Sequence, residues 1–436
     1  MFRRLLVIAT LAAAAFVAPA VGAPASVPGA DAPQLAALGP FAVGVESLTL
    51  TQPGQPDVLA YDPAARALPL RDRVLPIDVW YPAAPAANAT PVTYDGALTG
   101  EDGKDVPFTT PGIAVRDAPP RPGSFPLAIL AHGYGGTPVA MSWLAENLAS
   151  KGYVVVGLHF RDPPYGDASG FLGPLTRRPL DIAFVAGEAQ ARARGRLAPF
   201  AAADPARTVL IGYSMGGYGV LTTAGGALDP NLGPLTHGAL GPYVAGAPQA
   251  AALRVKGVVA VVAISPAGFL TGSEAWGGPG LAGVTAPTLF IVGGQDHTVV
   301  YDPGVKTLWE QAVHAPRYLL TFENGGHSIG MNGAPETMRS RLWDLDWWED
   351  PVWRKERVIG VQLHFITAFL GRYVKGEAAD AAFLDVPTPL SNDGAWPAKP
   401  GEPYAGFSPG PPASGVWKGF QHAHSAGLEL RFAPAQ

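Results

Sequence analysis

One short stretch of this sequence constrains the fold more than any other. Residues 212–216, Gly-Tyr-Ser-Met-Gly, directly follow the apolar run 208–211 and precede a run of small residues at 217–224. The pattern predicts a buried strand, a sharp turn and a helix, with Ser214 at the turn. Glycines are needed beside such a serine because neighbouring chain passes too close for a Cβ, and the serine itself is held in a strained conformation. Its hydroxyl is therefore expected to stand clear of the sheet edge.

A Gly-x-Ser-x-Gly turn also occurs by chance without any catalytic role, so the residues that follow decide between the two interpretations. Asp296 comes after the apolar run 288–292, and His327 comes after the run 317–322 and two glycines. Serine, aspartate and histidine in this order, each just beyond a strand, are typical of α/β-hydrolases. We predict Ser214 as the nucleophile, His327 as its base, and Asp296 as the acid that orients the base.

Other residues could occupy the acid and base positions. Asp302 competes with Asp296, but it precedes Pro303 and is better placed as the N-cap of a helix over 305–312. Four other histidines lie in predicted helices or near the C-terminus, where a packed or solvated imidazole is the default: His314, His364, His422 and His424.

Acyl transfer at a serine also requires two backbone N–H groups for the negative oxygen that develops. Met215, the residue after the predicted nucleophile, is expected to supply one. Tyr134, in the glycine-rich turn 132–136 after the apolar run 126–131, is expected to supply the other. His132 opens that turn, and we expect it to be a hydrogen-bonded structural residue rather than a metal ligand.

Several stretches together resemble the platelet-activating-factor acetylhydrolase and bacterial predicted dienelactone hydrolase group of α/β-hydrolases, with similarity to cutinase-like polyester hydrolases. They are 75–82, 132–136, 159–162, 212–216 and the loops of Asp296 and His327, and they span most of residues 40–375. The resemblance implies the same roles for the three triad residues and the two N–H donors. The chain has no cysteine, so the thiol nucleophile of true dienelactone hydrolases is excluded.

Strand and helix patterns alternate from Val43 to Val374, which favours a single α/β-hydrolase domain over residues 24–436, with N- and C-terminal extensions. We expect a mostly parallel central sheet with helices on both faces and loop-rich insertions. Strands are predicted at 43–51, 75–81, 125–131, 153–158, 208–211, 257–264, 288–292 and 317–322, and helices at 142–151, 180–197, 215–224, 305–312 and 353–374. Three long connections, 83–124, 161–179 and 225–256, are candidates for the rim of the site.

The N-terminus indicates export. Arg3 and Arg4, an apolar run at 5–17 and small residues before position 23 predict a secretory signal peptide over 1–23, and hence a periplasmic or extracellular protein. We expect no membrane-spanning segment in the mature chain. The formal net charge of −5 offers no basic surface for nucleic acid. Without zinc-ligand spacing or a phosphate-binding loop, we expect neither a metal nor another cofactor.

These features predict an exported serine hydrolase that cleaves small or lipid-like carboxylic esters through an acyl-serine. A polyester hydrolase is the main alternative. A serine peptidase is less favoured because no propeller repeats precede the core, and a non-catalytic binding protein because all three triad residues are present. A tryptophan cluster near the last helix either packs that helix on the core or walls the pocket: Trp343, Trp347, Trp348 and Trp353.

Overall fold

The protein is described by a computed structural model. It places residues 27–99, 104–162, 168–270, 273–277, 280–339, 347–393, 416–421 and 424–436. The predicted signal peptide, Trp343 and His422 lie outside these residues.

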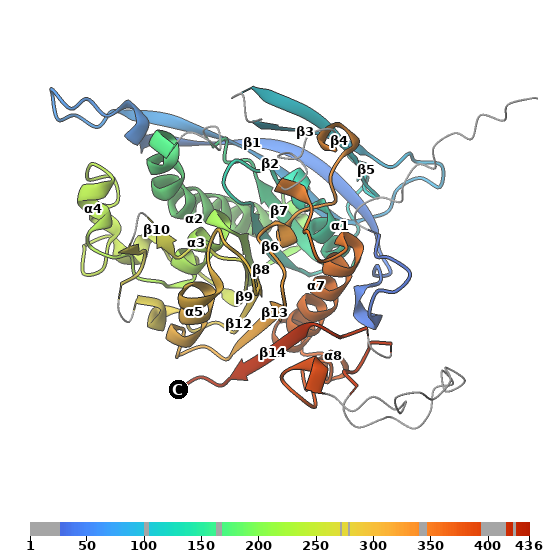
Figure 1. Ribbon diagram of the computed structural model, residues 1–436. Coiled ribbons are helices and arrows are strands. Elements are labelled where there is room, and N and C mark those ends of the chain that lie inside the picture. Colours follow the sequence, from blue (N-terminus) through green and yellow to red (C-terminus); the bar gives the residue numbers. More distant parts are fainter. Residues whose placement is uncertain are drawn as a thin grey trace, which may run out of the picture.

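A single ten-stranded sheet forms the centre of the molecule, in the order β14-β13-β12-β9-β8-β6-β7-β2-β1-β5 (Figure 1). Its strands from β7 to β13 are parallel, whereas β2 and β14 join them in the antiparallel direction. The strands are β1 (Ala42–Pro56), β2 (Leu70–Ala83), β5 (Val115–Arg116), β6 (Phe125–Ala131), β7 (Val154–Leu158), β8 (Ala203–Tyr213), β9 (Val258–Ile264), β12 (Thr288–Gly293), β13 (Arg317–Phe322) and β14 (Leu428–Ala433).

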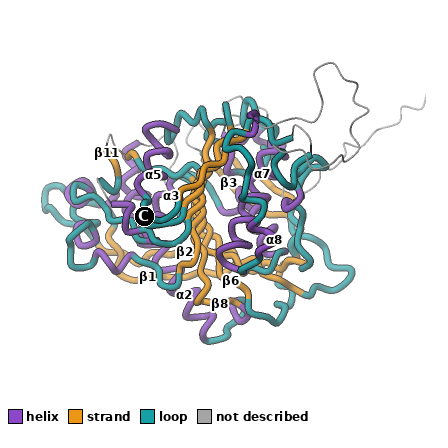
Figure 2. Tube along the Cα trace, turned by 90° about the horizontal axis from the view of Figure 1, so that it is seen from below, coloured by secondary structure: helices purple, strands orange, loops and turns teal. Residues whose placement is uncertain are grey.

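Helices cover both faces of this sheet, which Figure 2 shows nearly edge-on. On one face lie α1 (Ser142–Ser150), α7 (Lys355–Leu370) and the short α8 (Ala378–Ala381). On the other lie α2 (Leu172–Arg194), α3 (Met215–Ala224), α5 (Lys306–Gln311) and the short α4 (Leu232–Leu235). Together with the strand order, this architecture is the α/β-hydrolase fold, so the predicted fold class is confirmed.

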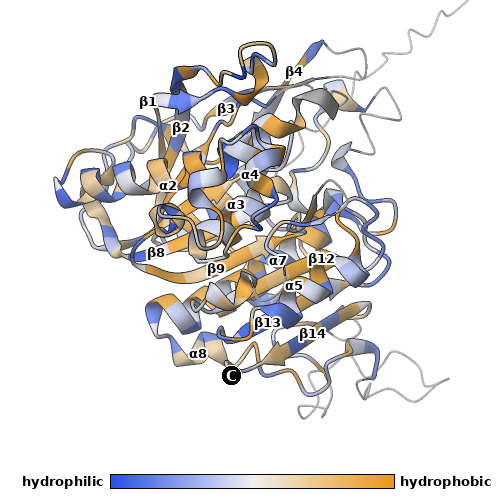
Figure 3. Cartoon of the chain, turned by 90° about the vertical axis from the view of Figure 1, so that its left-hand side faces the viewer, coloured by the Kyte–Doolittle hydropathy of each residue, from blue (hydrophilic) through white to orange (hydrophobic). Residues whose placement is uncertain are grey.

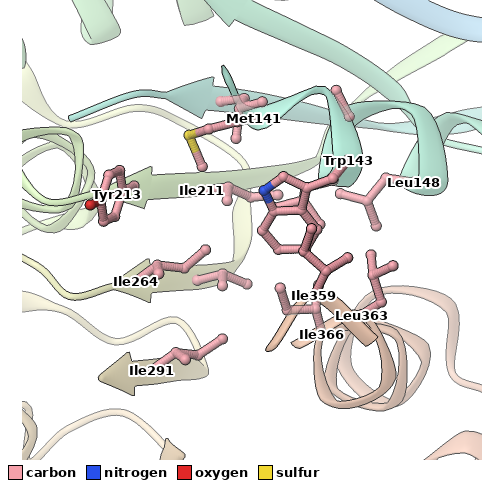
Figure 4. Close-up of a cluster of buried hydrophobic side chains, with 14 of the residues drawn as sticks. Met141, Trp143, Leu148, Ile211, Tyr213, Ile264, Ile291, Ile359, Leu363 and Ile366 are labelled. Atoms are coloured by element: carbon pink, nitrogen blue, oxygen red, sulfur yellow. The ribbon is translucent and has the colours of Figure 1, made fainter. Parts of the chain in front are cut away.

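Two apolar layers hold the helices against the sheet. Ile211, Ile264 and Ile291 of neighbouring strands β8, β9 and β12 face Trp143 of α1 and Ile359 of α7 (Figure 4). The residues next to them in sequence point to the opposite face and pack under α2, α3 and α5. A strand with both faces covered must be apolar throughout, which is why these segments appear as continuous hydrophobic runs and why the interior strands are coloured hydrophobic in Figure 3.

The structure adds strands that the sequence pattern did not indicate. The connection 83–124 contains β5 and the hairpin β3 (Thr93–Thr99) and β4 (Asp105–Pro111), whose apolar residues join the layer beneath α1. A second, very small hairpin pairs β10 (Phe269–Leu270) with β11 (Ser273–Glu274). The C-terminal strand β14 was also not predicted.

Helix α2 begins at Leu172, eight residues before the predicted start, and it contains Pro179. The prediction was wrong because a proline normally ends or kinks a helix, since it has no N–H for the carbonyl four residues earlier. Here the Tyr218 hydroxyl donates to that carbonyl, Leu175 O, at 3.1 Å. A side chain from α3 therefore supplies the donor that Pro179 lacks, and the helix continues.

Candidate active site

Ser214 lies between the last residue of β8 and the first of α3, in a conformation that few non-glycine residues adopt, with φ 53° and ψ −118°. A Cβ on Gly212 would lie 2.3 Å from the Gly216 carbonyl oxygen. A Cβ on Gly216 would lie 2.0 Å from the Ala131 carbonyl oxygen. Both glycines are therefore required by close backbone contact, as the sequence pattern predicted.

The structure brings the three predicted triad residues together at the carboxyl edge of the sheet. His327, in the loop after β13, has its Nε2 3.0 Å from the Ser214 Oγ. Its Nδ1 lies 2.8 Å from Oδ2 of Asp296, in the loop after β12. Because a carboxylate only accepts, Nδ1 carries the proton, and Nε2 of the neutral ring accepts the hydroxyl proton of Ser214.

Asp296 is held as an ionised acceptor. Its other oxygen, Oδ1, accepts the backbone N–H groups of Thr298 at 2.9 Å and Val299 at 3.0 Å. Burial alone would raise the pKa of this carboxyl, but the hydrogen bond and charge of His327 and the Val299 N–H outweigh it, and the pKa is lowered. The carboxylate therefore stays charged opposite the imidazole, where it favours a positive ring.

The two predicted N–H donors lie on the two segments next to the serine. Met215 is the first residue of α3, and the first N–H groups of a helix have no acceptor within the helix. Tyr134 lies in the loop after β6, directly after Gly133. A Cβ on Gly133 would lie 3.2 Å from the Ser214 Cβ, so the peptide that joins Gly133 to Tyr134 begins directly beside the serine.

His132 is buried beneath this loop and hydrogen-bonded, as expected. Its Nδ1 lies 2.7 Å from the Gly133 carbonyl oxygen, and its Nε2 accepts the Phe160 N–H at 3.3 Å. Burial and the nearby charge of Arg178 hold the pKa of His132 well below its usual range. The ring is therefore neutral, with its proton on Nδ1.

The competing residues lie elsewhere. The Asp302 carboxylate is exposed and accepts from the Lys306 ammonium at 2.9 Å. Its predicted role as an N-cap is wrong, because α5 begins at Lys306 without a side-chain cap. His314 is exposed and bonded to Ala282 O, whereas the buried His364 accepts the Leu35 N–H. The backbone of His424 accepts from Arg357.

Residues that the sequence analysis did not identify hold the His327 loop in place. The Asp350 carboxylate accepts the Gly326 N–H at 2.6 Å, and the buried Lys355 ammonium donates to Ser328 O at 2.7 Å. The Tyr213 hydroxyl donates to the backbone oxygen of His327 itself at 2.9 Å. Burial lowers the pKa of Lys355 to about 8, although Glu349 and Asp350 act in the opposite direction. No local pattern marks these residues, because their partners lie far away in the sequence.

The described tryptophans of the C-terminal cluster belong mainly to the core. Trp348 is fully buried and meets the Phe108 ring of β4 edge to face at 5.0 Å. Trp353 meets the Phe322 ring of β13 in the same way at 5.1 Å, and its indole N–H donates to Glu323 O. These contacts favour the packing interpretation for both residues. Trp347 is only partly buried.

A cavity of about 530 Å³ lies beside the loop that carries Tyr134. Its walls come from the β3–β4 hairpin, the loop after β6 and the loop after β7, including Asp95, Gly136, Arg161 and Asp162. Two of the three long connections thus contribute to a hollow at the carboxyl edge of the sheet. Within the described ranges, no three His, Asp or Glu side chains are grouped to hold a metal ion, and no helix is long and apolar enough to cross a membrane.

No protein-family model and no curated protein matches this chain. Among solved structures, it is similar to a ferulic acid esterase from Streptomyces cinnamoneus, with 20% sequence identity and a TM-score of 0.48. The similarity covers 77% of this chain and 91% of that chain.

Proposed function

We propose that this protein is a serine hydrolase of carboxylic esters. The observation that carries the proposal is the continuous relay from the Ser214 hydroxyl through His327 to Asp296, with distances of 3.0 and 2.8 Å. A strained serine at a sheet edge, bonded to a neutral imidazole that is in turn bonded to a carboxylate, is the arrangement that activates a hydroxyl for attack on a carbonyl.

In the proposed reaction, His327 takes the proton of Ser214 as the Oγ attacks the ester carbonyl. Asp296 stabilises the imidazolium that forms, and the N–H groups of Met215 and Tyr134 bind the oxyanion. The imidazolium then gives its proton to the departing alcohol, which leaves an acyl-serine. Water then attacks the acyl carbon and gives a proton to His327. The bond between this carbon and the Ser214 Oγ breaks, the acid leaves, and the imidazolium returns the proton to the Oγ. Every proton transfer uses groups of this chain, so the proposal includes no metal or other cofactor.

The proposed substrates are small or lipid-like esters, by resemblance to the acetylhydrolase and predicted dienelactone hydrolase group; a polyester surface is the alternative. We further propose that residues 1–23 direct export to the periplasm or the medium. The proposed substrate class and the proposed export both rest on the sequence alone. We expect no nucleic acid partner, because the net charge is −5.

The test compares Ser214→Ala with Ser150→Ala. Ser150 is a second buried serine, and its hydroxyl accepts the Gly39 N–H and donates to the Asn147 carbonyl oxygen. The substrates are p-nitrophenyl esters of graded acyl length, a peptide amide and a polyester film. We expect Ser214→Ala to lower ester turnover by about 10³-fold or more with an unchanged melting temperature, whereas Ser150→Ala retains turnover. A fluorophosphonate should label Ser214 in the parent protein. Full turnover in Ser214→Ala would overturn the proposal.

A further inference from the structure

A fully buried ion pair lies behind the loop that carries Tyr134. Arg178, on α2, and Asp162, after β7, have side chains that are 0% and 3% exposed. Two parallel hydrogen bonds join them, at 3.0 and 2.6 Å, and the guanidinium lies 3.7 Å from the centre of the Phe160 ring. A buried charge pair adds little stability compared with apolar packing, so its presence calls for another explanation.

Both partners of this pair also hold the backbone of the loop. Arg178 Nη2 donates to the Gly133 carbonyl oxygen at 3.0 Å, and Asp162 Oδ2 accepts the Gly135 N–H at 3.0 Å. The protonated Nδ1 of His132 donates to the same Gly133 oxygen at 2.7 Å. The peptide groups on either side of Tyr134 are therefore both fixed, one through its oxygen and the other through its nitrogen.

These contacts also determine the direction of the Tyr134 N–H. Gly133 C=O and Tyr134 N–H belong to one planar trans peptide, so they point in opposite directions. Because the carbonyl points inward to Arg178 and His132, the N–H points to the other side of the peptide. Rotating this peptide would remove an acceptor from a buried guanidinium, which is costly.

We propose that Arg178 and Asp162 are positioning residues for the oxyanion hole: together they keep the Gly133–Tyr134 peptide oriented so that its N–H stabilises the transition state. This inference rests on the proposed esterase function. Both side chains are buried on the far side of the loop backbone, which they hold through hydrogen bonds. Their effect passes through the loop backbone, so it falls on the step in which negative charge develops and leaves the Ser214–His327–Asp296 relay intact.

The test is Arg178→Met, with Arg177→Met as the matched control. Arg177 is the preceding residue on the same helix, and its guanidinium pairs with Asp57 at 2.8 Å instead. We expect Arg178→Met to lower kcat by about 10²-fold with little change in KM, because a misaligned hole donor acts in the transition state. Inhibition by phenylboronic acid, which forms a tetrahedral anionic adduct on the serine, should weaken by a similar factor. The pH of the acid limb of kcat/KM should not move, since His327 keeps its partners.

Loss of Arg178 leaves a buried carboxylate alone, which can prevent folding, so a second variant is needed. Arg178→Met combined with Asp162→Asn removes both charges and keeps an acceptor for the Gly135 N–H. We expect this folded double variant to show the same loss of kcat and of boronate affinity. Three outcomes would overturn the inference. These are a parental kcat in either folded Arg178 variant, a change in KM with kcat unaffected, and an equal loss of kcat in Arg177→Met. Full turnover in Ser214→Ala would show that the esterase proposal itself is wrong. If Ser214→Ala loses turnover, any of these three outcomes would show only that the positioning role is wrong.

Discussion

The two loops beside Ser214 are held by different chemistry. The loop with Tyr134 is fixed by the guanidinium of Arg178 and its carboxylate partner. The loop with His327 is fixed by Asp350 and by the ammonium of Lys355, both from the C-terminal part of the chain. A guanidinium stays charged at any pH in which a protein folds, whereas burial lowers the pKa of Lys355 to about 8. The Lys355 support of the second loop therefore changes its charge near pH 8.

The two loops are also expected to contribute to catalysis in different ways. The loop with Tyr134 is expected to act on the developing negative charge, and the loop with His327 on the transfer of the proton. A change in the first should therefore leave the pH dependence of the reaction in place. A change in the second should affect the base, the stability of the C-terminal region, or both.

The largest effect is expected from Asp296→Asn, which keeps the shape of the side chain but removes its charge. An amide can donate to the ring, so the imidazole can adopt the tautomer that no longer accepts the Ser214 proton. We expect kcat to fall by about 10⁴-fold with a melting temperature close to that of the parent. Steady-state kinetics and thermal unfolding check this. A fall of less than tenfold would show that Asp296 does not orient the base.

A smaller effect, mainly on stability, is expected from Asp350→Ala. This carboxylate accepts three backbone N–H groups, from Gly326, Val352 and Trp353, at 2.6, 2.9 and 2.7 Å. Removing it leaves these donors without their acceptor, so the free energy of unfolding should fall by about 1–3 kcal/mol. Urea denaturation measures the loss. Asp350→Asn keeps one oxygen acceptor and should lose less, and equal stability in all three proteins would contradict the anchoring role.

The effect that is smallest at neutral pH is expected from Lys355→Met, because it appears as a change in how stability depends on pH above about 8. In the folded chain the pKa of Lys355 is about 8, below its ordinary value of 10.5. Between these two pH values the unfolded chain binds more protons than the folded one, so this group makes stability rise with pH, by at most about 1.4 kcal/mol per unit. Below pH 8 its contribution is constant, because both states are protonated.

Urea unfolding between pH 8 and 10 tests this slope. Lys355→Met should reduce the rise of the unfolding free energy with pH, whereas Lys256→Met, a change at an exposed lysine, should leave the rise as it is. An unchanged slope in Lys355→Met would mean that the ammonium is not desolvated in the folded protein. The supports of the two loops would then not differ in how their charge responds to pH.

The centre of the site could be predicted because its determinants are local. A strand, two glycines and a serine define the turn at Ser214 within a few residues, and the loops of Asp296 and His327 each follow an apolar run. Parallel strands then bring all three to one edge, so chain order suffices. The same reasoning places Tyr134 and Met215 next to the serine, though not their N–H directions.

The supports of the site could not be predicted because tertiary packing selects them. Asp162 pairs with Arg178, which lies on a helix that was predicted to begin at residue 180 but begins at Leu172. Asp350 lies 24 residues beyond the glycine it holds. Nothing in the residues around Pro179 indicates that a tyrosine of another helix would satisfy the carbonyl that a proline normally leaves without a donor.

The C-terminal strand β14 has a consequence for how this protein behaves in solution. It pairs with β13 along the whole of that strand, from Arg317 to Phe322, and every residue of β13 is buried. Without this cover, β13 would present a row of unpaired N–H and C=O groups on an apolar segment, which is a template for pairing with other molecules. β14 therefore covers the backbone groups of β13, the strand that leads into the His327 loop, and takes the edge position itself.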